Sequence, residues 1–176
     1  RRERNLEYGG HTVEAVPDIP NEIIRRIKLA AETEDADVTL IEIGGTVGEY
    51  QNVLYLEAAR MMKSESPSDV GVLLVSYLPV PSTVGEMKTK PTQYASQALN
   101  SAGLSADFIL ARAPVALDQK RKKKIARSCN VATEHVISAP DVESIYDIPL
   151  NFEREKFSEQ ICDLLKLPCR KTKQLD

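Results

Sequence analysis

The stretch 86–93 has residue types that could bind a phosphorylated ligand. Lys88 and Lys90 stand just before Pro91, a residue that suits the first turn of a helix and keeps its predecessor extended. The free N–H groups of a helix start attract anions, and two lysines would add positive charge there. Three side chains add neutral donors and acceptors for a base or a ribose: Thr89, Thr92 and Gln93. A solvated polar loop is the plainer alternative, but three features converging on one helix start favour binding.

A second candidate is the stretch 42–48, Glu-Ile-Gly-Gly-Thr-Val-Gly. Glu42 follows an apolar run, and a carboxylate at the end of a buried strand is costly unless something compensates it. Magnesium near nucleotide phosphates is one natural compensation. The glycines would let backbone N–H groups approach a ligand closely. A tight strand-to-helix turn, with Glu42 in a salt bridge, explains the pattern equally well.

The third candidate is the run 120–124, five consecutive cations. Such a run can bind nucleic acid, but no aromatic residue lies among these, and the chain carries a formal net charge of −3. We therefore interpret most of the run as a solvated helix face and expect no nucleic-acid partner. A single lysine, Lys124, is expected to point toward the strand ends.

The elements that would position these stretches alternate between helices and strands. The patterns predict helices at 20–32, 52–62, 91–103, 118–129 and 157–165, and strands at 37–43, 70–78, 107–111 and 135–138. This alternation predicts an α/β fold with a parallel sheet and helices on both faces. Ligands of such sheets bind at the carboxyl ends of the strands, which directs attention to the loops 42–52, 79–93 and 111–118. Many chemistries use this architecture, so the fold alone does not select one.

Composition sets broad limits on the chain. Its 176 residues can form one domain with a hydrophobic core, and the longest apolar stretch, 70–77, suits a strand and is too short for a membrane span. The three cysteines are Cys129, Cys162 and Cys169, an odd and widely spaced set that indicates reduced thiols in a cytoplasmic protein. The chain starts with arginine and shows no secretory signal, so we expect that its first residue is not the natural start.

These motifs together resemble the CTP synthase family. The stretches 42–48 and 88–93 (Lys-Thr-Lys-Pro-Thr-Gln), followed by 136–146, occur in the family's order, and 5–10 and 129–131 match as well. The resemblance covers about residues 1–166. It implies a three-layer domain similar to P-loop NTPases and dethiobiotin synthetase, of which 1–166 would be the C-terminal portion of the amidoligase domain and 167–176 the start of a linker or tail.

The resemblance also implies a reaction. ATP would phosphorylate O4 of the uracil ring of UTP, and ammonia, released from glutamine in a separate glutaminase domain, would displace that phosphate to give CTP. The family implies Mg²⁺, GTP as an allosteric activator and a homo-oligomer, a tetramer. The alternative is a non-catalytic module that retains nucleotide binding or oligomerisation.

Matching position by position assigns roles to residues of this chain. Catalytic roles go to Lys88 and Lys90, and the magnesium ligand would be Glu42. The UTP and CTP contacts would be Glu49, Tyr50, Gln51, Lys88, Thr89, Lys90, Pro91, Thr92, Gln93 and Lys124. The ATP contacts would be Arg112, Pro140, Asp141 and Val142.

Several positions depart from the family pattern. Residues 48–52 read Gly-Glu-Tyr-Gln-Asn where the family has Gly-Asp-Ile-Glu-Ser, so Gln51 retains hydrogen bonding without the charge. Asp18 stands where the family has a histidine, and Ser128 replaces an aromatic residue. These changes affect contacts for product feedback more than those for the chemistry. The phosphate-loop pattern G-x-x-x-x-G-K-[ST] occurs nowhere in the 176 residues, so we expect an incomplete portion of an enzyme.

Overall fold

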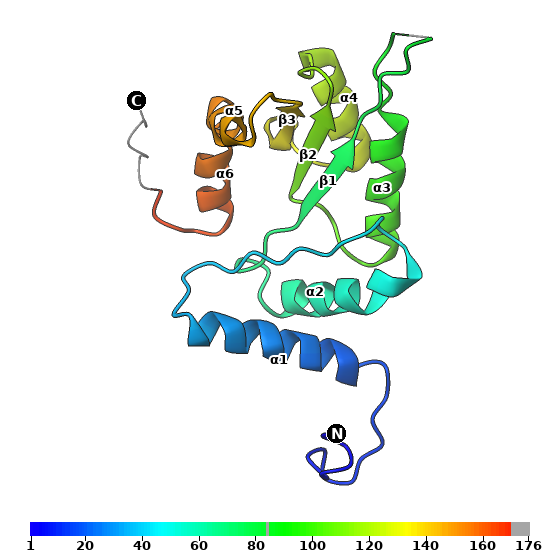
Figure 1. Ribbon diagram of the computed structural model, residues 1–176, viewed down its shortest axis with the longest axis vertical. Helices are drawn as coiled ribbons and strands as arrows, with labels where there is room; N and C mark the ends of the chain where they lie inside the picture. Colours follow the sequence, from blue (N-terminus) through cyan, green and yellow to red (C-terminus); the bar gives the residue numbers. More distant parts are fainter. Residues whose placement is uncertain (84, 170–176) are drawn as a thin grey trace. The chain divides into compact units, whose positions relative to one another are not determined.

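A computed structural model describes residues 1–83 and 85–169, and the chain divides into two units, Arg1–Glu65 and Ser66–Asp176. The predicted tail at 167–176 falls mostly outside the described residues. In the N-terminal unit, helix α1 (Asp18–Thr33) packs against α2 (Val53–Glu65), which follows a 3₁₀ turn at Tyr50–Asn52 (Figure 1). Both helices form where the apolar periodicity predicted them.

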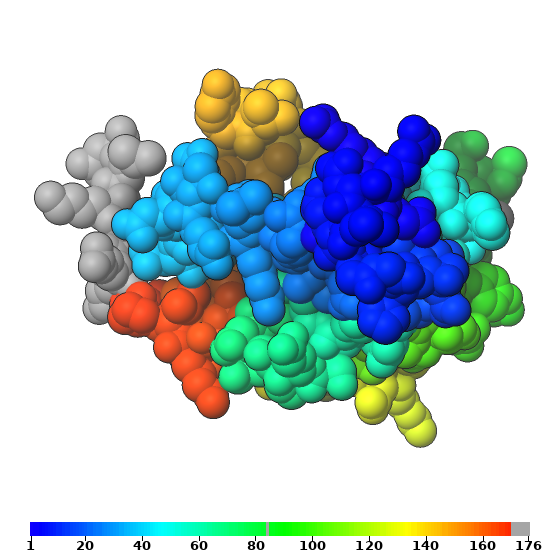
Figure 2. Space-filling model, turned by 90° about the horizontal axis from the view of Figure 1, so that it is seen from below, coloured from blue at the N-terminus to red at the C-terminus, as the bar shows by residue number. Residues whose placement is uncertain are grey.

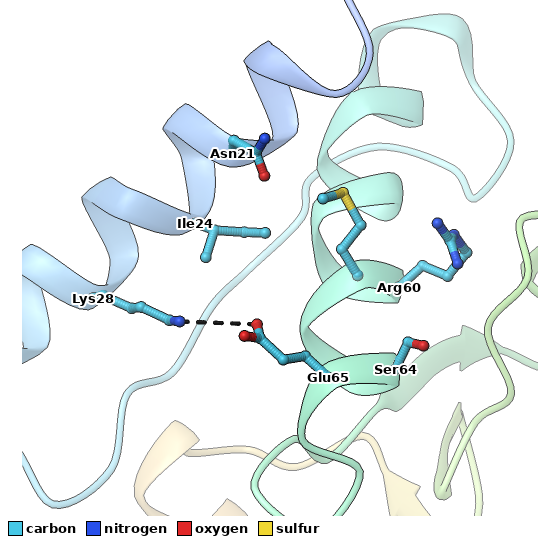
Figure 3. Close-up of a pocket in the computed structure, with 7 residues that line it drawn as sticks. Asn21, Ile24, Lys28, Arg60, Ser64 and Glu65 are labelled. Atoms are coloured by element: carbon cyan, nitrogen blue, oxygen red, sulfur yellow. Dashed lines mark ion pairs between the residues drawn. The ribbon is translucent and has the colours of Figure 1, made fainter.

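The groove between these two helices is open and polar at its rim. Its volume is about 580 Å³, and Figure 3 shows Lys28 of α1 facing Glu65 of α2 across it, with 3.9 Å between the ammonium and the carboxylate. Ile24 is the buried apolar contact at its floor. The remaining lining residues are Asn21, Arg60, Met61 and Ser64. None of the residues predicted to bind a nucleotide lines this groove.

The predicted strand at 37–43 is wrong. In the structure this segment is irregular, and three of its apolar side chains are exposed, Val38 by 49%, Leu40 by 94% and Ile41 by 51%, while Ile43 is half-buried. A strand is stable only when its N–H and C=O groups pair with a neighbouring strand, and within the described residues this segment has no such pairing. The apolar run shows that the segment can form a strand, but it does not specify the neighbouring strand that such a strand needs.

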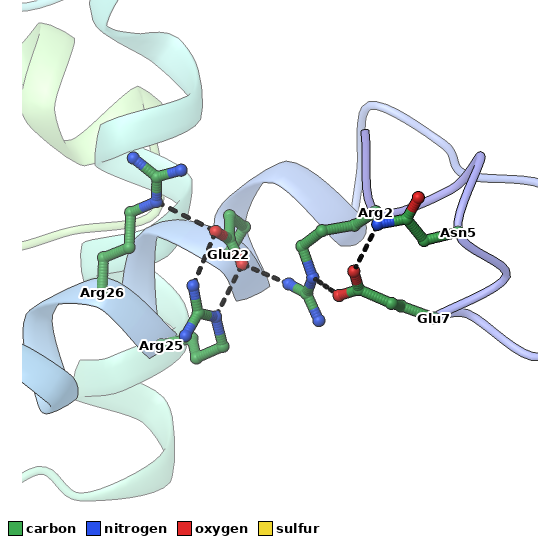
Figure 4. A network of polar contacts seen from close by, with 6 residues as sticks. All are labelled: Arg2, Asn5, Glu7, Glu22, Arg25 and Arg26. Carbon is green, nitrogen blue, oxygen red and sulfur yellow. Dashed lines mark hydrogen bonds and ion pairs between the residues drawn. The ribbon is translucent and has the colours of Figure 1, made fainter.

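The N-terminal residues are attached to α1 through one carboxylate. Glu22 accepts hydrogen bonds from Arg2 at 2.5 Å, from Arg25 at 2.8 and 2.9 Å and from Arg26 at 2.9 Å (Figure 4). Arg2 also bonds Glu7 at 2.7 Å, and Figure 2 shows the first residues gathered against the start of α1. Hydrogen bonds from the guanidinium groups, first Arg25 and then Arg26, hold the pKa of Glu22 well below its usual range.

This network should make stability depend on pH in the acid range. An unfolded glutamate titrates near 4.5, so the stabilisation from the lowered pKa of Glu22 is complete above that pH and is lost as the pH falls toward the folded value. We expect Glu22→Gln to lower the urea midpoint above pH 4.5, and the gap to the parent chain to shrink below it. Glu14→Gln, which changes an exposed carboxylate, serves as the control. A gap that stays constant between pH 6 and pH 3 would contradict this account.

The C-terminal unit is built on a parallel sheet. Its strands β1 (Leu73–Tyr77), β2 (Phe108–Ala113) and β3 (Val136–Pro140) pair in the order β1-β2-β3. Helix α3 (Lys90–Ser101) connects β1 to β2, and α4 (Gln119–Cys129) connects β2 to β3. Two short helices follow, α5 (Ile148–Arg154) and α6 (Phe157–Leu164). The predicted α/β fold with a parallel sheet is confirmed, while α5 is a helix that the sequence patterns did not predict.

Helices cover both faces of this sheet, as Figure 1 shows for α3 and α6. Thr92 of α3 bonds Ser76 of β1, which places α3 on the face that Ser76 presents. On the other face, Phe108 of β2 packs edge-on against Phe157 of α6, with ring centroids 5.3 Å apart. The α5–α6 pair covers the β2–β3 half of that face. Three side chains of edge strand β1 on the same face are between 38% and 59% exposed: Leu73, Val75 and Tyr77.

Candidate functional site

The loop after β1 leads directly into the α3 helix start at the carboxyl ends of the strands. Leu78 continues the sheet by donating its N–H to the carbonyl of Arg112, at 2.7 Å. The two ends of the loop that follows are joined by a hydrogen bond of 2.9 Å, which the N–H of Lys88 donates to the carbonyl of Pro79. Pro91 lies in the first turn of α3, as its fixed φ favours. The loop 79–93, expected to carry a site, therefore lies at the binding end of the sheet.

The motif 88–93 splits into buried and accessible side chains. Thr92 is fully buried and bonds Ser76 at 2.9 Å, and Thr89 is 5% exposed and accepts a bond from Gln93 at 3.3 Å. Lys90 is exposed, and Lys88 is half-buried. The two lysines are thus the side chains that this helix start can offer to an anion, while the threonine hydroxyls are engaged within the protein.

Positive charge gathers around one glutamate beside this helix start. Lys88 bonds Glu86 at 3.0 Å, and this bond, with its charge, lowers the pKa of Glu86. Arg121 and Lys124 of α4 lower the pKa of Glu86 further through their charges, so they lie within electrostatic reach. Lys124 was predicted to point toward the strand ends, and this orientation stays a prediction. Arg121 was not predicted, because the run 120–124 does not show by itself which of its side chains lie near Glu86.

Helix α4 is fixed in orientation by its first residues. Asp118 caps it by accepting the N–H of Arg121 at 2.7 Å, and the side chain of Arg121 also pairs with Asp118. Lys122 is only 8% exposed and pairs with Glu155, which follows α5. The interpretation of the basic run as a solvated face is therefore wrong at Lys122. Its position three and seven residues before Ile125 and Cys129 puts it on the buried side of α4.

The ends of β2 and β3 bring the predicted ATP contacts together. Arg112 lies 3.6 Å from Asp141, measured between guanidinium and carboxylate, and both side chains are largely exposed. The N–H of Asp141 donates to the carbonyl of Ala113 at 2.9 Å, which extends the β2–β3 pairing past Pro140. Beyond it lies a cavity of about 370 Å³ lined by Val142, Glu143, Asp147, Leu150, Asn151 and Arg154. An open cavity thus begins where the sheet pairing ends.

The remaining predicted residues belong to the N-terminal unit. Glu42 is exposed in the irregular segment, so the expectation that it ends a buried strand is wrong. Gly45 has φ +87°, a left-handed backbone conformation that is strained for residues with a Cβ and that glycine adopts freely. Glu49 accepts a bond from Gln51 at 2.8 Å, and Tyr50 is 96% exposed.

The residues present fit magnesium only as a partial ligand set. Within residues 1–83 and 85–169, no three of the histidine, cysteine, aspartate and glutamate side chains form a cluster able to hold a metal ion. The carboxylate of Glu42 is exposed and lies close to the backbone of Gly44: a Cβ added at Gly44 would be 3.5 Å from Oε1 of Glu42. A single carboxylate is compatible with Mg²⁺, which takes few protein ligands when nucleotide phosphates and water supply the others.

Among the residues that the structure describes, no helix has both the length and the apolar character needed to span a bilayer.

Comparison with known proteins extends the resemblance seen in the motifs. The family described as CTP synthase N-terminus matches residues 1–167. The chain is 39% identical over 180 aligned residues to a CTP synthase of Saccharolobus solfataricus, covering 100% of this chain and 33% of that protein. It is 40% identical over 168 residues to a CTP synthase of Streptococcus pyogenes, covering 95% of this chain and 32% of that protein. The chain therefore spans about a third of the length of these relatives.

Proposed function

Because this chain belongs to the CTP synthase N-terminus family, we propose that it supplies the UTP- and CTP-binding part of an enzyme that aminates UTP to CTP with ATP. The observation that carries the proposal is the cationic cluster at the α3 start, defined as Lys88, Lys90, Arg121 and Lys124. A nucleoside triphosphate carries several negative charges, and the loop and helix start that carry Lys88 and Lys90 follow β1 at the carboxyl end of the sheet, where such ligands bind.

Glu86 pairs with Lys88 in the absence of a ligand and would have to be displaced when a nucleotide binds. Its carboxylate holds Lys88 at 3.0 Å and neutralises part of the charge. A triphosphate brings more negative charge and more acceptor oxygens than one carboxylate, so it would take over the ammonium of Lys88 and release Glu86 toward solvent. Glu86, which is exposed, can make that move without breaking the core.

The ATP base would lie against the ends of β2 and β3. The backbone N–H of Asp141 is already used by Ala113, so the carbonyl of Asp141 and the backbone of Val142 are left for the edge of the adenine. Arg112 would stack on or flank the base, held by its contact with Asp141. The neighbouring cavity, which Val142 lines, gives the base room.

Magnesium would be held by Glu42 together with phosphate oxygens, and when bound it supplies charge neutralisation for phosphoryl transfer. The resemblance also assigns contacts with a pyrimidine nucleotide to Glu49, Tyr50 and Gln51, which belong to the N-terminal unit. Gln51 replaces an acidic residue of the family pattern, so its contact would be a neutral hydrogen bond.

Lys88→Ala tests the nucleotide assignment. We expect the substitution to weaken CTP binding by about 1.5–3 kcal/mol, because one hydrogen bond between charged partners is lost. That loss corresponds to roughly a tenfold to 150-fold rise in Kd, measured by calorimetric titration of CTP. Lys123→Ala is the matched control, since it removes an equal charge from an exposed position on α4. Equal affinity of Lys88→Ala and the parent chain would remove Lys88 from the site.

A further inference from the structure

We infer that Ser76 and Thr92 are positioning residues for the cationic cluster: the bond between their hydroxyls fixes the first turn of α3, and with it Lys88 and Lys90, relative to the end of β1. The inference rests on the proposed nucleotide site and assigns a role to Ser76, a residue outside the motif. It also gives Thr92 a role that needs no contact between its side chain and the ligand.

The hydroxyl pair lies deep in the protein. Ser76 is 8% exposed and Thr92 is 0% exposed, and their oxygens are 2.9 Å apart. Ser76 is the fourth of the five residues of β1, and Thr92 is the third residue of α3. The bond therefore joins the end of a strand directly to the beginning of a helix, across a loop of twelve residues that separates Tyr77 from Lys90.

A second bond works with the hydroxyl pair. The N–H of Lys88 donates to the carbonyl of Pro79 at 2.9 Å, which closes the loop just before α3 begins. Met87 and Thr89, on either side of Lys88, are buried, 6% and 5% exposed. The backbone of Lys88 is thus held on its loop side by Pro79 and on its helix side, through Thr92, by Ser76. The two lysine side chains then extend from a backbone with little freedom to rotate.

Removing the two hydroxyls singly and together distinguishes a role in positioning the helix start from a role in stabilising the fold alone. Removing one hydroxyl leaves the other buried and without a partner, which destabilises the fold. Removing both leaves an apolar contact of nearly the same shape, and such a double replacement costs little stability. An apolar contact does not fix a direction as a hydrogen bond does, so the helix start regains rotational freedom although the fold is restored.

The experiment compares four variants of the 176-residue chain: Ser76→Ala, Thr92→Val, the double variant, and Thr92→Ser, which retains the hydroxyl. Urea unfolding measures stability, and calorimetric titration measures the Kd for CTP. We expect each single deletion to lower the urea midpoint and the double variant to recover most of that loss. The Kd of the double variant is expected to stay raised about fivefold to tenfold, the equivalent of one hydrogen bond, and that of Thr92→Ser to stay within about twofold of the parent. A double variant that regains both stability and affinity would overturn the inference.

A second readout is independent of ligand binding. The amides of Lys88 and Gln93 report the helix start, because they bond the carbonyls of Pro79 and Thr89. In the double variant we expect their hydrogen exchange to speed up at least about fivefold, while amides in β2 keep the parent rate. Unchanged exchange at both positions would overturn the inference. If the parent chain failed to bind CTP, the proposed function would fail, and these two amides alone would decide whether Ser76 and Thr92 fix the helix start.

Discussion

Supplied with UTP, ATP, magnesium and ammonium chloride, the purified 176-residue chain is expected to form no CTP above a protein-free control. Ammonium removes the need for glutamine hydrolysis, so the assay isolates the phosphorylation and amination of UTP. Phosphoryl transfer depends almost entirely on positioning the transferred group and neutralising its charge. The residues proposed for ATP, Arg112 and Pro140–Val142, are proposed to contact the base and not the phosphates.

The sequence supports this expectation directly. The phosphate-binding pattern G-x-x-x-x-G-K-[ST] is missing from the 176 residues, and the cationic cluster is assigned to the pyrimidine nucleotide. The positive control is the Saccharolobus solfataricus CTP synthase, assayed under the same conditions. Steady CTP formation by the isolated chain would show that some of these residues position the ATP phosphates. That result would refute the division of roles proposed for the two nucleotides.

The largest loss of stability is expected from Phe108→Ala. Phe108 is 0% exposed, its ring centroid lies 4.4 Å from that of His135 and 5.3 Å from that of Phe157, and it therefore joins β2 to α6. Truncating a buried aromatic ring to alanine costs about 3–5 kcal/mol, through lost transfer free energy and the cavity left behind. Because the chain has no tryptophan, far-UV circular dichroism in urea is the suitable measurement.

Tyr94→Ala is the matched control for this prediction. Tyr94 lies on α3 and is 62% exposed, so the same kind of truncation should change the free energy of unfolding by no more than about 0.5 kcal/mol. A cost below about 1 kcal/mol for Phe108→Ala would mean that α6 does not pack on the sheet as described.

The sequence predicted those elements that local patterns determine. Helix α3 was placed by Pro91, and the strands β1, β2 and β3 were placed by short apolar runs bounded by polar residues. Their observed bounds differ from the predicted ones by a few residues, since pairing and capping set the ends and apolar patterns do not. The segment 37–43 has the same kind of apolar run, yet it is not a strand, because within the described residues no neighbouring strand pairs with it.

The candidate site was predictable by residue type and less so by orientation. The pattern predicts Lys88, Lys90 and Lys124 as site residues, and these stay predictions, but nothing local showed that Thr92 would be buried against a strand sixteen residues earlier. Lys122 could have been recognised as inward-facing from its helical spacing to Ile125 and Cys129. Its partner could not, because Glu155 is thirty-three residues away and follows a helix that the sequence patterns did not predict.

The partly exposed stripe of β1 affects how stability varies with temperature. Leu73, Val75 and Tyr77 are already in partial contact with water in the folded chain, so unfolding adds less apolar surface at these positions than at a strand covered on both faces. Newly exposed apolar surface is the main source of the heat-capacity increase on unfolding. These three positions should therefore add less to that increase than covered positions would, by about 0.45 cal/mol/K for each Å² of apolar surface already in contact with water. The free energy of unfolding would follow a slightly flatter curve against temperature than it would with this stripe covered.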